Sequence, residues 1–229
     1  MISAIVTDIE GTTSAIAFVK ETLFPFAAEA LDGFLDAHGQ DPQVQAVLAA
    51  VPGPDQRATL RAWMAEDAKV TPLKTLQGMI WRAGFEDGRL KGHLWPDVPG
   101  CLHAWSKAGV ALAVYSSGSV EAQRLLFRHS QAGNLEPLFF AFFDTRIGAK
   151  REPASYAAIA TALACLPAEI LFLSDVAEEL DAAAQHGLQT CQLVRAADGT
   201  QPSGRHPAAE NFPAVAELFG LPEPGHAAG

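Results

Sequence analysis

Short apolar segments alternate with helical patterns after residue 97, and this alternation constrains the fold more than any other feature of the chain. The apolar segments are residues 110–115, 139–143, 170–173 and 191–194. Between them, apolar residues recur every three or four positions, as on one face of a helix. Strands separated by helices are typical of a parallel sheet with right-handed crossover connections. Residues 2–7 have the same strand character, so the sequence predicts an α/β fold in which they belong to the sheet.

A long helical block interrupts this alternation after the first strand. Apolar residues recur at helical spacing, for example at Leu73, Leu76 and Ile80, and the block shows no strand pattern. Pro25 predicts a bend or a break in its first helix. We therefore expect residues 1–14 and 98–221 to form a discontinuous α/β core. Residues 15–97 would be a helical insertion, and residues 222–229 a frayed tail.

Composition and charge exclude several classes of function. The 229 residues carry a formal net charge of -10, which argues against nucleic acid or an anionic membrane as a partner. Three widely spaced cysteines form no Cys-x-x-Cys pair, and the histidines show no metal-ligand spacing. Neither a signal peptide nor a membrane-spanning run is visible. We expect a cytoplasmic monomer that acts on a small molecule.

Polar side chains follow four of the predicted strands. They are Asp8 and Glu10, Ser116 and Ser117, Lys150, and Asp175 with Glu178 and Glu179. Because parallel strands end at one edge of a sheet, these groups should lie near one another. Carboxylates suit Mg²⁺, a lysine suits a phosphoryl group, and the start of a helix after Ser119 suits phosphate oxygens. Each group alone also has an ordinary explanation, such as a solvated acidic turn, a surface lysine or acids that complement a helix dipole.

Taken in order, the four strand ends resemble the motifs of the haloacid dehalogenase-like hydrolases. That family has an Asp-x-Asp-like element after strand one, then a Ser or Thr, a Lys and an acidic strand end. Longer segments, some inside the helical insertion, narrow the resemblance to the enolase-phosphatases of methionine salvage. These segments are Asp8-Ile9-Glu10-Gly11-Thr12-Thr13, Leu76-Gln77-Gly78-Met79-Ile80-Trp81, Leu90-Lys91-Gly92-His93, Tyr115-Ser116-Ser117-Gly118-Ser119 and Phe172-Leu173-Ser174-Asp175-Val176. Glu10 stands where phosphatases of the superfamily usually carry Asp.

The resemblance implies a fold and an activity. The fold is a Rossmann-like parallel-sheet core of the haloacid dehalogenase type with an inserted helical cap. The activity is the conversion of 2,3-diketo-5-methylthiopentyl-1-phosphate to an acireductone, 1,2-dihydroxy-3-keto-5-methylthiopentene, and phosphate. The substrate is first enolised and then dephosphorylated through an aspartyl-phosphate, with Mg²⁺ as cofactor.

The resemblance also implies roles for individual residues. Asp8 is the nucleophile, and Asp8, Asp175 and the backbone carbonyl of Glu10 hold the metal. Ser116, Ser117 and Lys150 hold the phosphate, and Lys150 also takes part in catalysis. The side chain of Glu10 is expected to transfer protons and to take part in enolisation. Of the two glutamates after Asp175, only Glu179 matches the family position.

Three other functions stay open at this point. A generic Mg²⁺-dependent phosphatase of the same superfamily would share the core motifs but not those of the insertion. A dehalogenase would have no use for Asp175 as a metal ligand. A non-catalytic phosphate-binding protein would not need Asp8, Lys150 and Asp175 together. Lys74, Gln77 and Trp81 either reach over the site as part of a cap or lie on the surface of a packed helix.

Overall fold

The computed structural model describes residues 1–225, and the chain divides into two compact units. One unit combines Met1–Ile16 with the chain from Gly92 onward, and the other is Ala17–Lys91. The expected boundaries lay after residues 14 and 97, so the return to the first unit comes six residues earlier than the pattern indicated. The end of the expected tail, residues 226–229, lies outside the described residues.

The first unit is built around one six-stranded sheet in which every pairing is parallel, as the sequence predicts. The strands, in the spatial order β3-β2-β1-β4-β5-β6, are Phe139–Phe143, Ala111–Tyr115, Ala4–Thr7, Ile170–Ser174, Gln189–Leu193 and Ala208–Ala209. All four residues of β1 are buried, which is typical of a parallel strand covered on both faces. In the register, Thr7 pairs with Val114 on one side and with Leu173 on the other. The chain therefore leaves β1 beside the ends of β2 and β4.

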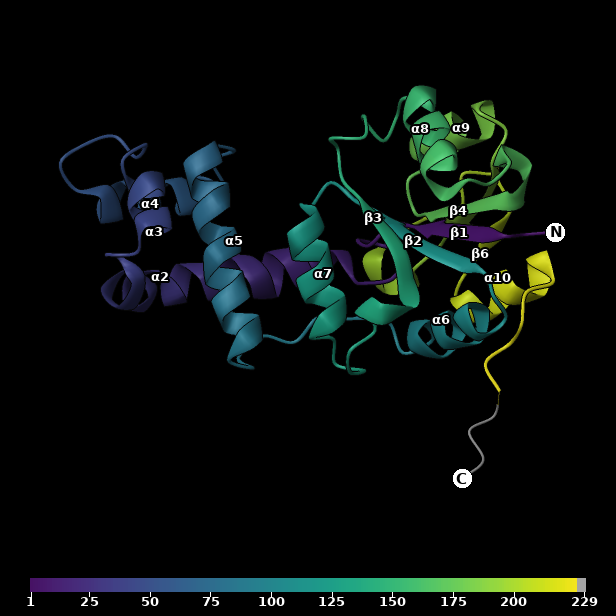
Figure 1. Ribbon diagram of the computed structural model, residues 1–229, viewed down its shortest axis with the longest axis horizontal. Coiled ribbons are helices and arrows are strands. Elements are labelled where there is room, and N and C mark those ends of the chain that lie inside the picture. The colour runs from purple at the N-terminus through teal and green to yellow at the C-terminus, as the bar shows by residue number, and fades with distance from the viewer. Residues whose placement is uncertain (226–229) are drawn as a thin grey trace. The chain divides into compact units, whose positions relative to one another are not determined.

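Helices cover both faces of this sheet (Figure 1), with α8 and α9 on one side and α6 and α10 on the other. The helices of the unit are α6 (Val98–Lys107), α7 (Val120–Arg128), α8 (Pro153–Leu163), α9 (Ala177–Gln185) and α10 (Phe212–Phe219). Within residues 1–225, no helix combines the length and the apolar character needed to cross a membrane.

The two layers of helices pack through large side chains. Tyr156 of α8 and Leu180 of α9 are fully buried in one cluster with Phe172 of β4. In the other layer, the ring of Trp105 in α6 stacks on Phe212 of α10, with centroids 5.3 Å apart. The indole Nε1 of Trp105 donates to the carbonyl of Pro222 at 3.1 Å, so the first residue of the expected tail is held by the core.

One strand was not predicted. The last strand expected from the sequence was residues 191–194, but β6 follows it and pairs with β5 through Gln192 and Ala208. Its two residues are alanines, which have low strand propensity, so no local pattern marks it. These two residues form a strand because they pair with the edge of β5.

The second unit is all-helical, as predicted. A short α-helix (α1, Ile16–Phe18) and a π-helical turn (Val19–Leu23) lead into α2 (Phe24–His38), α3 (Pro42–Leu48), α4 (Gln56–Ala65) and α5 (Thr71–Glu86). Their apolar faces meet in a core that includes Leu31, Leu60 and Leu76, none of which is exposed. Pro25 does not break a helix, because it lies in the first turn of α2, where its missing N–H is not needed. The predicted bend is replaced by the π-helical turn that precedes it.

Candidate active site

The ends of three adjacent strands bring the predicted site residues to one edge of the sheet. Asp8 follows β1, Ser116 follows β2 and Asp175 follows β4. The ladder continues one residue past β1, because the amide of Asp8 donates to the carbonyl of Leu173 at 2.9 Å. The carboxyl edge of an open parallel sheet is where such folds bind ligands.

A tight turn fixes the direction of the Asp8 side chain. The carbonyl of Ile9 accepts the amides of Thr12, Thr13 and Ser14 at 3.2, 3.0 and 2.8 Å. The amide of Ile9 donates to Oδ1 of Asp8 at 2.7 Å, and Asp8 is only 5% exposed. One carboxylate oxygen is thus held by the backbone, and the other is left to face the site.

Lys150 joins two buried carboxylates at the centre of the site. Its Nζ lies 2.7 Å from Oδ2 of Asp8 and 2.7 Å from Oε2 of Glu179, and all three side chains are at most 11% exposed. Burial alone would lower the pKa of Lys150, but Asp8 and Glu179 outweigh it and the pKa lies above its ordinary value. Glu179 also accepts a hydrogen bond from Ser174 Oγ at 3.0 Å. This ammonium is therefore a fixed point charge, suited to an anionic group that approaches Asp8.

The environment of Asp175 suits the binding of a divalent cation. Burial, followed by the nearby charge of Asp8, raises the pKa of Asp175 to about 7. A carboxylate whose charged form is disfavoured beside a second carboxylate suits a cation shared with it. Among residues 1–225 no group of three His, Cys, Asp or Glu side chains is arranged to hold a metal ion. A cation here would therefore take two carboxylates and complete its shell with carbonyl oxygens and water, as Mg²⁺ commonly does.

Gly11 leads to a testable prediction about this arrangement. Its φ is +70°, and a Cβ at this position would overlap the carboxylate of Asp175. We expect Gly11→Ala to displace that carboxylate, to lower phosphatase activity about 100-fold and to raise the Mg²⁺ concentration needed for half-maximal activity. Hydrolysis of p-nitrophenyl phosphate across a Mg²⁺ titration measures both effects.

Gly109 offers the matched control for this substitution. Its φ is +84°, but a Cβ there would meet nothing within 4 Å. Gly109→Ala should therefore carry the backbone strain alone, roughly 1 kcal/mol, and leave the Mg²⁺ requirement unchanged. Equal activity loss in both variants would show that the effect of Gly11→Ala is backbone strain and not displacement of Asp175.

Three buried hydroxyls hold the backbone that leads to Lys150. Each donates to one of three consecutive carbonyls: Tyr115 to Gly148 at 2.9 Å, Ser155 to Ala149 at 2.7 Å and Tyr156 to Lys150 at 2.6 Å. The two tyrosines, which are the only ones in the chain, meet edge to face with centroids 5.8 Å apart. Tyr115 begins one of the family segments quoted above, but no role was predicted for Tyr115, Ser155 or Tyr156. The signal that could have revealed this role was a pair of tyrosines at predicted core positions near the site, because a buried Tyr hydroxyl normally has a hydrogen-bond partner.

The predicted phosphate-binding residues differ in exposure. Ser116 is 4% exposed, and its Oγ accepts the amide of Gly118 at 3.3 Å. Ser117 is exposed at the same loop. Ser119 caps α7 as predicted, because its Oγ accepts the amide of Ala122 at 3.2 Å. The loop is thus ordered by its own hydrogen bonds, while its contact with phosphate stays a prediction.

The glutamates near the site fall into different environments. Glu178 is an exposed side chain that pairs with Arg205 at 3.2 Å, whereas Glu179 is buried against Lys150. The structure therefore brings Glu179, and not Glu178, together with Asp8. Glu10 is exposed, and its backbone forms a bridge with Ser14. Its assignments as a metal ligand and as a proton-transfer group stay predictions.

Lys74, Gln77 and Trp81, which were expected either over the site or on the surface of a packed helix, differ in their environments. Gln77 is 8% exposed and Lys74 is exposed. The indole Nε1 of Trp81 donates to the carbonyl of Leu23 at 2.8 Å, and its ring stacks on Phe24. Gln77 and Trp81 thus belong to the packing of this unit.

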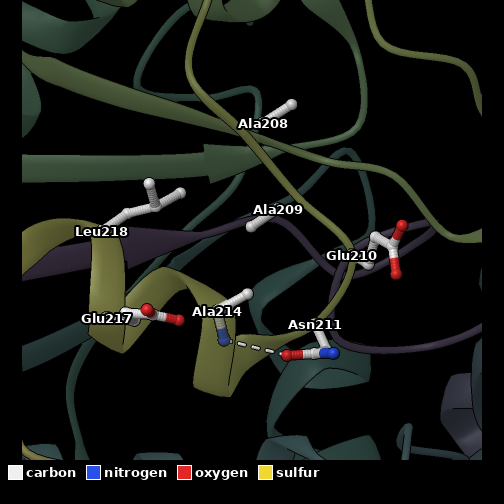
Figure 2. Close-up of a pocket in the computed structure, with 7 residues that line it drawn as sticks. All are labelled: Ala208, Ala209, Glu210, Asn211, Ala214, Glu217 and Leu218. Atoms are coloured by element: carbon white, nitrogen blue, oxygen red, sulfur yellow. Dashed lines mark hydrogen bonds between the residues drawn. The ribbon is translucent and has the colours of Figure 1, made fainter.

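A separate pocket lies between β6 and α10 (Figure 2). Its lining consists of Ala208, Ala209, Glu210, Asn211, Ala214, Glu217 and Leu218. Asn211 is occupied as a helix cap, because its Oδ1 accepts the amide of Ala214 at 2.9 Å. No predicted site residue lines this pocket, and its two acids would repel an anionic substrate. The strand ends are therefore the better candidate for the active site.

Comparison with known proteins agrees with this geometry. The family model of haloacid dehalogenase-like hydrolases matches residues 2–187. A protein of Granulibacter bethesdensis named enolase-phosphatase E1 is 56% identical over 226 residues, which cover 96% of this chain and 98% of that protein. The chain belongs to the enolase-phosphatase family of haloacid dehalogenase-like hydrolases.

Two other known proteins are similar to this chain over nearly its full length. The enolase-phosphatase E1 of Acidiphilium cryptum is 53% identical over 221 residues, 95% of each chain. The crystal structure of the UTR4 protein of Saccharomyces cerevisiae superposes with a TM-score of 0.81 at 33% identity, covering 93% of this chain and 99% of that one. The similarity in sequence and in structure thus spans both the core and the helical insertion.

Proposed function

We propose that this chain is a bifunctional enolase-phosphatase of methionine salvage, an acireductone synthase. It converts 2,3-diketo-5-methylthiopentyl-1-phosphate to 1,2-dihydroxy-3-keto-5-methylthiopentene and phosphate. The observation that carries the proposal is the buried contact of Lys150 with both Asp8 and Glu179 at the strand ends. The relatives named enolase-phosphatase E1, similar over nearly the full length, support the choice of substrate. A monomeric state and a cytoplasmic location stay predictions.

Asp8 acts as the nucleophile in phosphate release. Its outward oxygen Oδ2 attacks phosphorus, the bond from phosphorus to the enol oxygen breaks, and an aspartyl-phosphate forms. Water then attacks phosphorus, and the carboxylate of Asp8 is released together with inorganic phosphate. Ser116, Ser117 and Lys150 donate hydrogen bonds to the phosphoryl oxygens and keep phosphorus in line with Oδ2.

The donor set at the strand ends fits Mg²⁺. Asp8 and Asp175 would hold the ion through carboxylates, and Glu10 would hold it through its backbone carbonyl. When bound, Mg²⁺ neutralises charge on the phosphoryl group and polarises the carbonyl oxygens of the diketone. Gly11 leaves the room that Asp175 needs to approach this turn. Lys150 bridges Asp8 and Glu179 by pairing with both.

The Glu10 carboxyl is assigned to proton transfer. As an acid it protonates the leaving enol oxygen, and as a base it activates the water that cleaves the aspartyl-phosphate. Its side chain is one methylene longer than the Asp usual in related phosphatases, so it reaches further toward the substrate carbon. We therefore include it in the enolisation step.

The Glu10→Gln variant tests the bifunctional assignment. We expect it to lose both enol formation and phosphate release by about 100-fold or more, because Gln neither accepts nor gives a proton. Ultraviolet absorbance reports the enol, and a colorimetric assay reports phosphate, with the diketone phosphate and Mg²⁺ present. Glu178→Gln is the control, because Glu178 pairs with Arg205 outside the site and should keep both activities. Full enolisation by Glu10→Gln would remove Glu10 from that step.

Two alternatives are separated by simple assays. Hydrolysis of p-nitrophenyl phosphate that stops when Mg²⁺ is chelated supports an enzyme, while phosphate binding without hydrolysis supports a non-catalytic binder. A generic phosphatase would release phosphate from the diketone phosphate without an enol species. The family motifs within the insertion favour the bifunctional enzyme over this second alternative.

A further inference from the structure

A buried arginine outside the predicted site contacts the turn that carries Asp8. Arg195 follows β5 and is 5% exposed. Its Nη2 and Nε both donate to the carbonyl of Thr12, at 2.8 and 3.1 Å. This carbonyl lies four residues beyond the nucleophile in the same turn. A charged donor on a buried carbonyl is among the stronger hydrogen bonds in proteins.

The guanidinium is itself held in one orientation. Its Nη1 lies 3.0 Å from each carboxylate oxygen of Asp97. It also lies over the rings of Trp95 and Phe212, at 5.4 and 5.7 Å from their centroids. Asp97 in turn accepts the amide of Phe212 at 2.8 Å. A planar cation fixed by a carboxylate and aromatic rings is a rigid support, which a flexible lysine would not provide.

Neighbouring contacts hold the rest of the same turn. The carbonyl of Thr13 accepts the amide of Trp95 at 2.9 Å. The carboxylate of Asp198 accepts the amide of Ile16 at 3.2 and 3.3 Å, where the chain leaves the first unit. The amides of the turn donate to the carbonyl of Ile9, whereas the carbonyls of Thr12 and Thr13 accept from Arg195 and Trp95.

We propose that Arg195, oriented by Asp97, is a positioning residue that holds the Asp8 turn in its reactive geometry. Arg195 lies beyond residues 2–187, the part of the chain that matches the family model, so no family motif assigns it. Its guanidinium donates to Thr12, Asp97 and Glu210 and to none of the predicted catalytic or phosphate-binding residues, so it acts through the backbone of Thr12. The inference rests on the proposed role of Asp8 as nucleophile.

The expected kinetic signature follows from this placement. A nucleophile that shifts by about 1 Å loses roughly 100-fold in rate, because the attack on phosphorus is no longer in line. Ser116, Ser117 and Lys150 are held by other segments, so binding of the phosphate should change little. Loss of Arg195 should therefore lower kcat and leave KM nearly unchanged.

The test compares Arg195→Met with the control Arg205→Met in the full-length protein. Arg205 follows the same strand but pairs with the exposed carboxylate of Glu178 and does not contact the turn. With p-nitrophenyl phosphate and Mg²⁺, we expect Arg195→Met to lose about 100-fold in kcat with KM within about threefold. Hydrogen exchange should become about tenfold faster in residues 9–16 and stay unchanged in residues 170–174. The control should match wild type in all three readouts.

The outcomes separate this inference from the proposed function. Wild-type kcat and wild-type exchange in Arg195→Met would overturn the positioning role, as would a rise in KM at unchanged kcat. If wild type releases no phosphate, the proposed function fails, and exchange in residues 9–16 still decides whether Arg195 holds the turn. If Arg195→Met does not fold, Asp97→Asn replaces it, because Asn keeps an acceptor for Phe212 but loses the charge that orients Arg195. Asp97→Asn should also show faster exchange in residues 9–16 and a lower kcat, with both changes smaller than in Arg195→Met.

Discussion

Asp8→Asn is expected to lower phosphate release by about 10⁴-fold, the largest effect of any single substitution in this chain. Asn matches the shape of Asp and keeps an oxygen for the amide of Ile9, which donates to Oδ1 at 2.7 Å. It lacks the nucleophilic carboxylate, so no aspartyl-phosphate can form. The measurement is phosphate release from the diketone phosphate under single-turnover conditions, together with mass spectrometry of the acid-quenched protein. Wild type should carry an added phosphoryl group, and the variant should not.

Asp181→Asn is the control for this substitution. Asp181 pairs with Arg205 and with His206 and belongs to no predicted site. Its removal should leave phosphate release within about threefold of wild type, as is usual for surface groups outside a site. Phosphate release by Asp8→Asn at more than a tenth of the wild-type rate would mean that Asp8 is not the nucleophile.

Lys150→Met is expected to have the second largest effect, because it removes a buried charge that two carboxylates share. Phosphatase activity should fall about 1,000-fold, since the phosphoryl oxygens lose a fixed cation. The free energy of unfolding at neutral pH should fall by about 3 kcal/mol, because Asp8 and Glu179 are left buried without their partner. Steady-state kinetics and urea unfolding monitored by circular dichroism measure the two effects.

A second variant separates the structural from the catalytic part of this loss. Lys150→Met combined with Glu179→Gln removes one of the two stranded carboxylates, so it should recover part of the stability and none of the activity. Lys107→Met, at an exposed position in α6, should change neither. Stability unaltered by Lys150→Met would contradict the buried pairing seen in the structure.

The fold was predictable because its elements carry strong local patterns. The first strand and the segments at β2, β3 and β4 are apolar and short, and each is followed by a helical pattern. Parallel order then follows from the crossover rule, without knowledge of any contact. By contrast, β6 consists of Ala208 and Ala209, and only the edge of β5 makes them a strand. The π-helical turn before Pro25 was also not predicted, and the carbonyl of its last residue, Leu23, accepts from Trp81, which lies far away in the chain.

The site was predictable at strand ends and not beyond them. Asp8, Lys150 and Asp175 follow strands, so a parallel sheet must bring them to one edge. The choice of Glu179 over Glu178 needed the resemblance, since the helix that carries them could present either. Arg195 gave no signal, because its partners are a backbone carbonyl at Thr12 and residues far away in the chain. Local patterns carry no information on such a contact.

A time course with the wild-type enzyme tests the central claim most directly. The diketone phosphate is mixed with enzyme and Mg²⁺, and ultraviolet absorbance of the enol and released phosphate are followed in the same sample. For the bifunctional enzyme we expect the enol absorbance to appear first and phosphate to follow after a lag. Phosphate release without a preceding enol species would contradict the bifunctional mechanism and would assign the chain to the generic phosphatases of its superfamily.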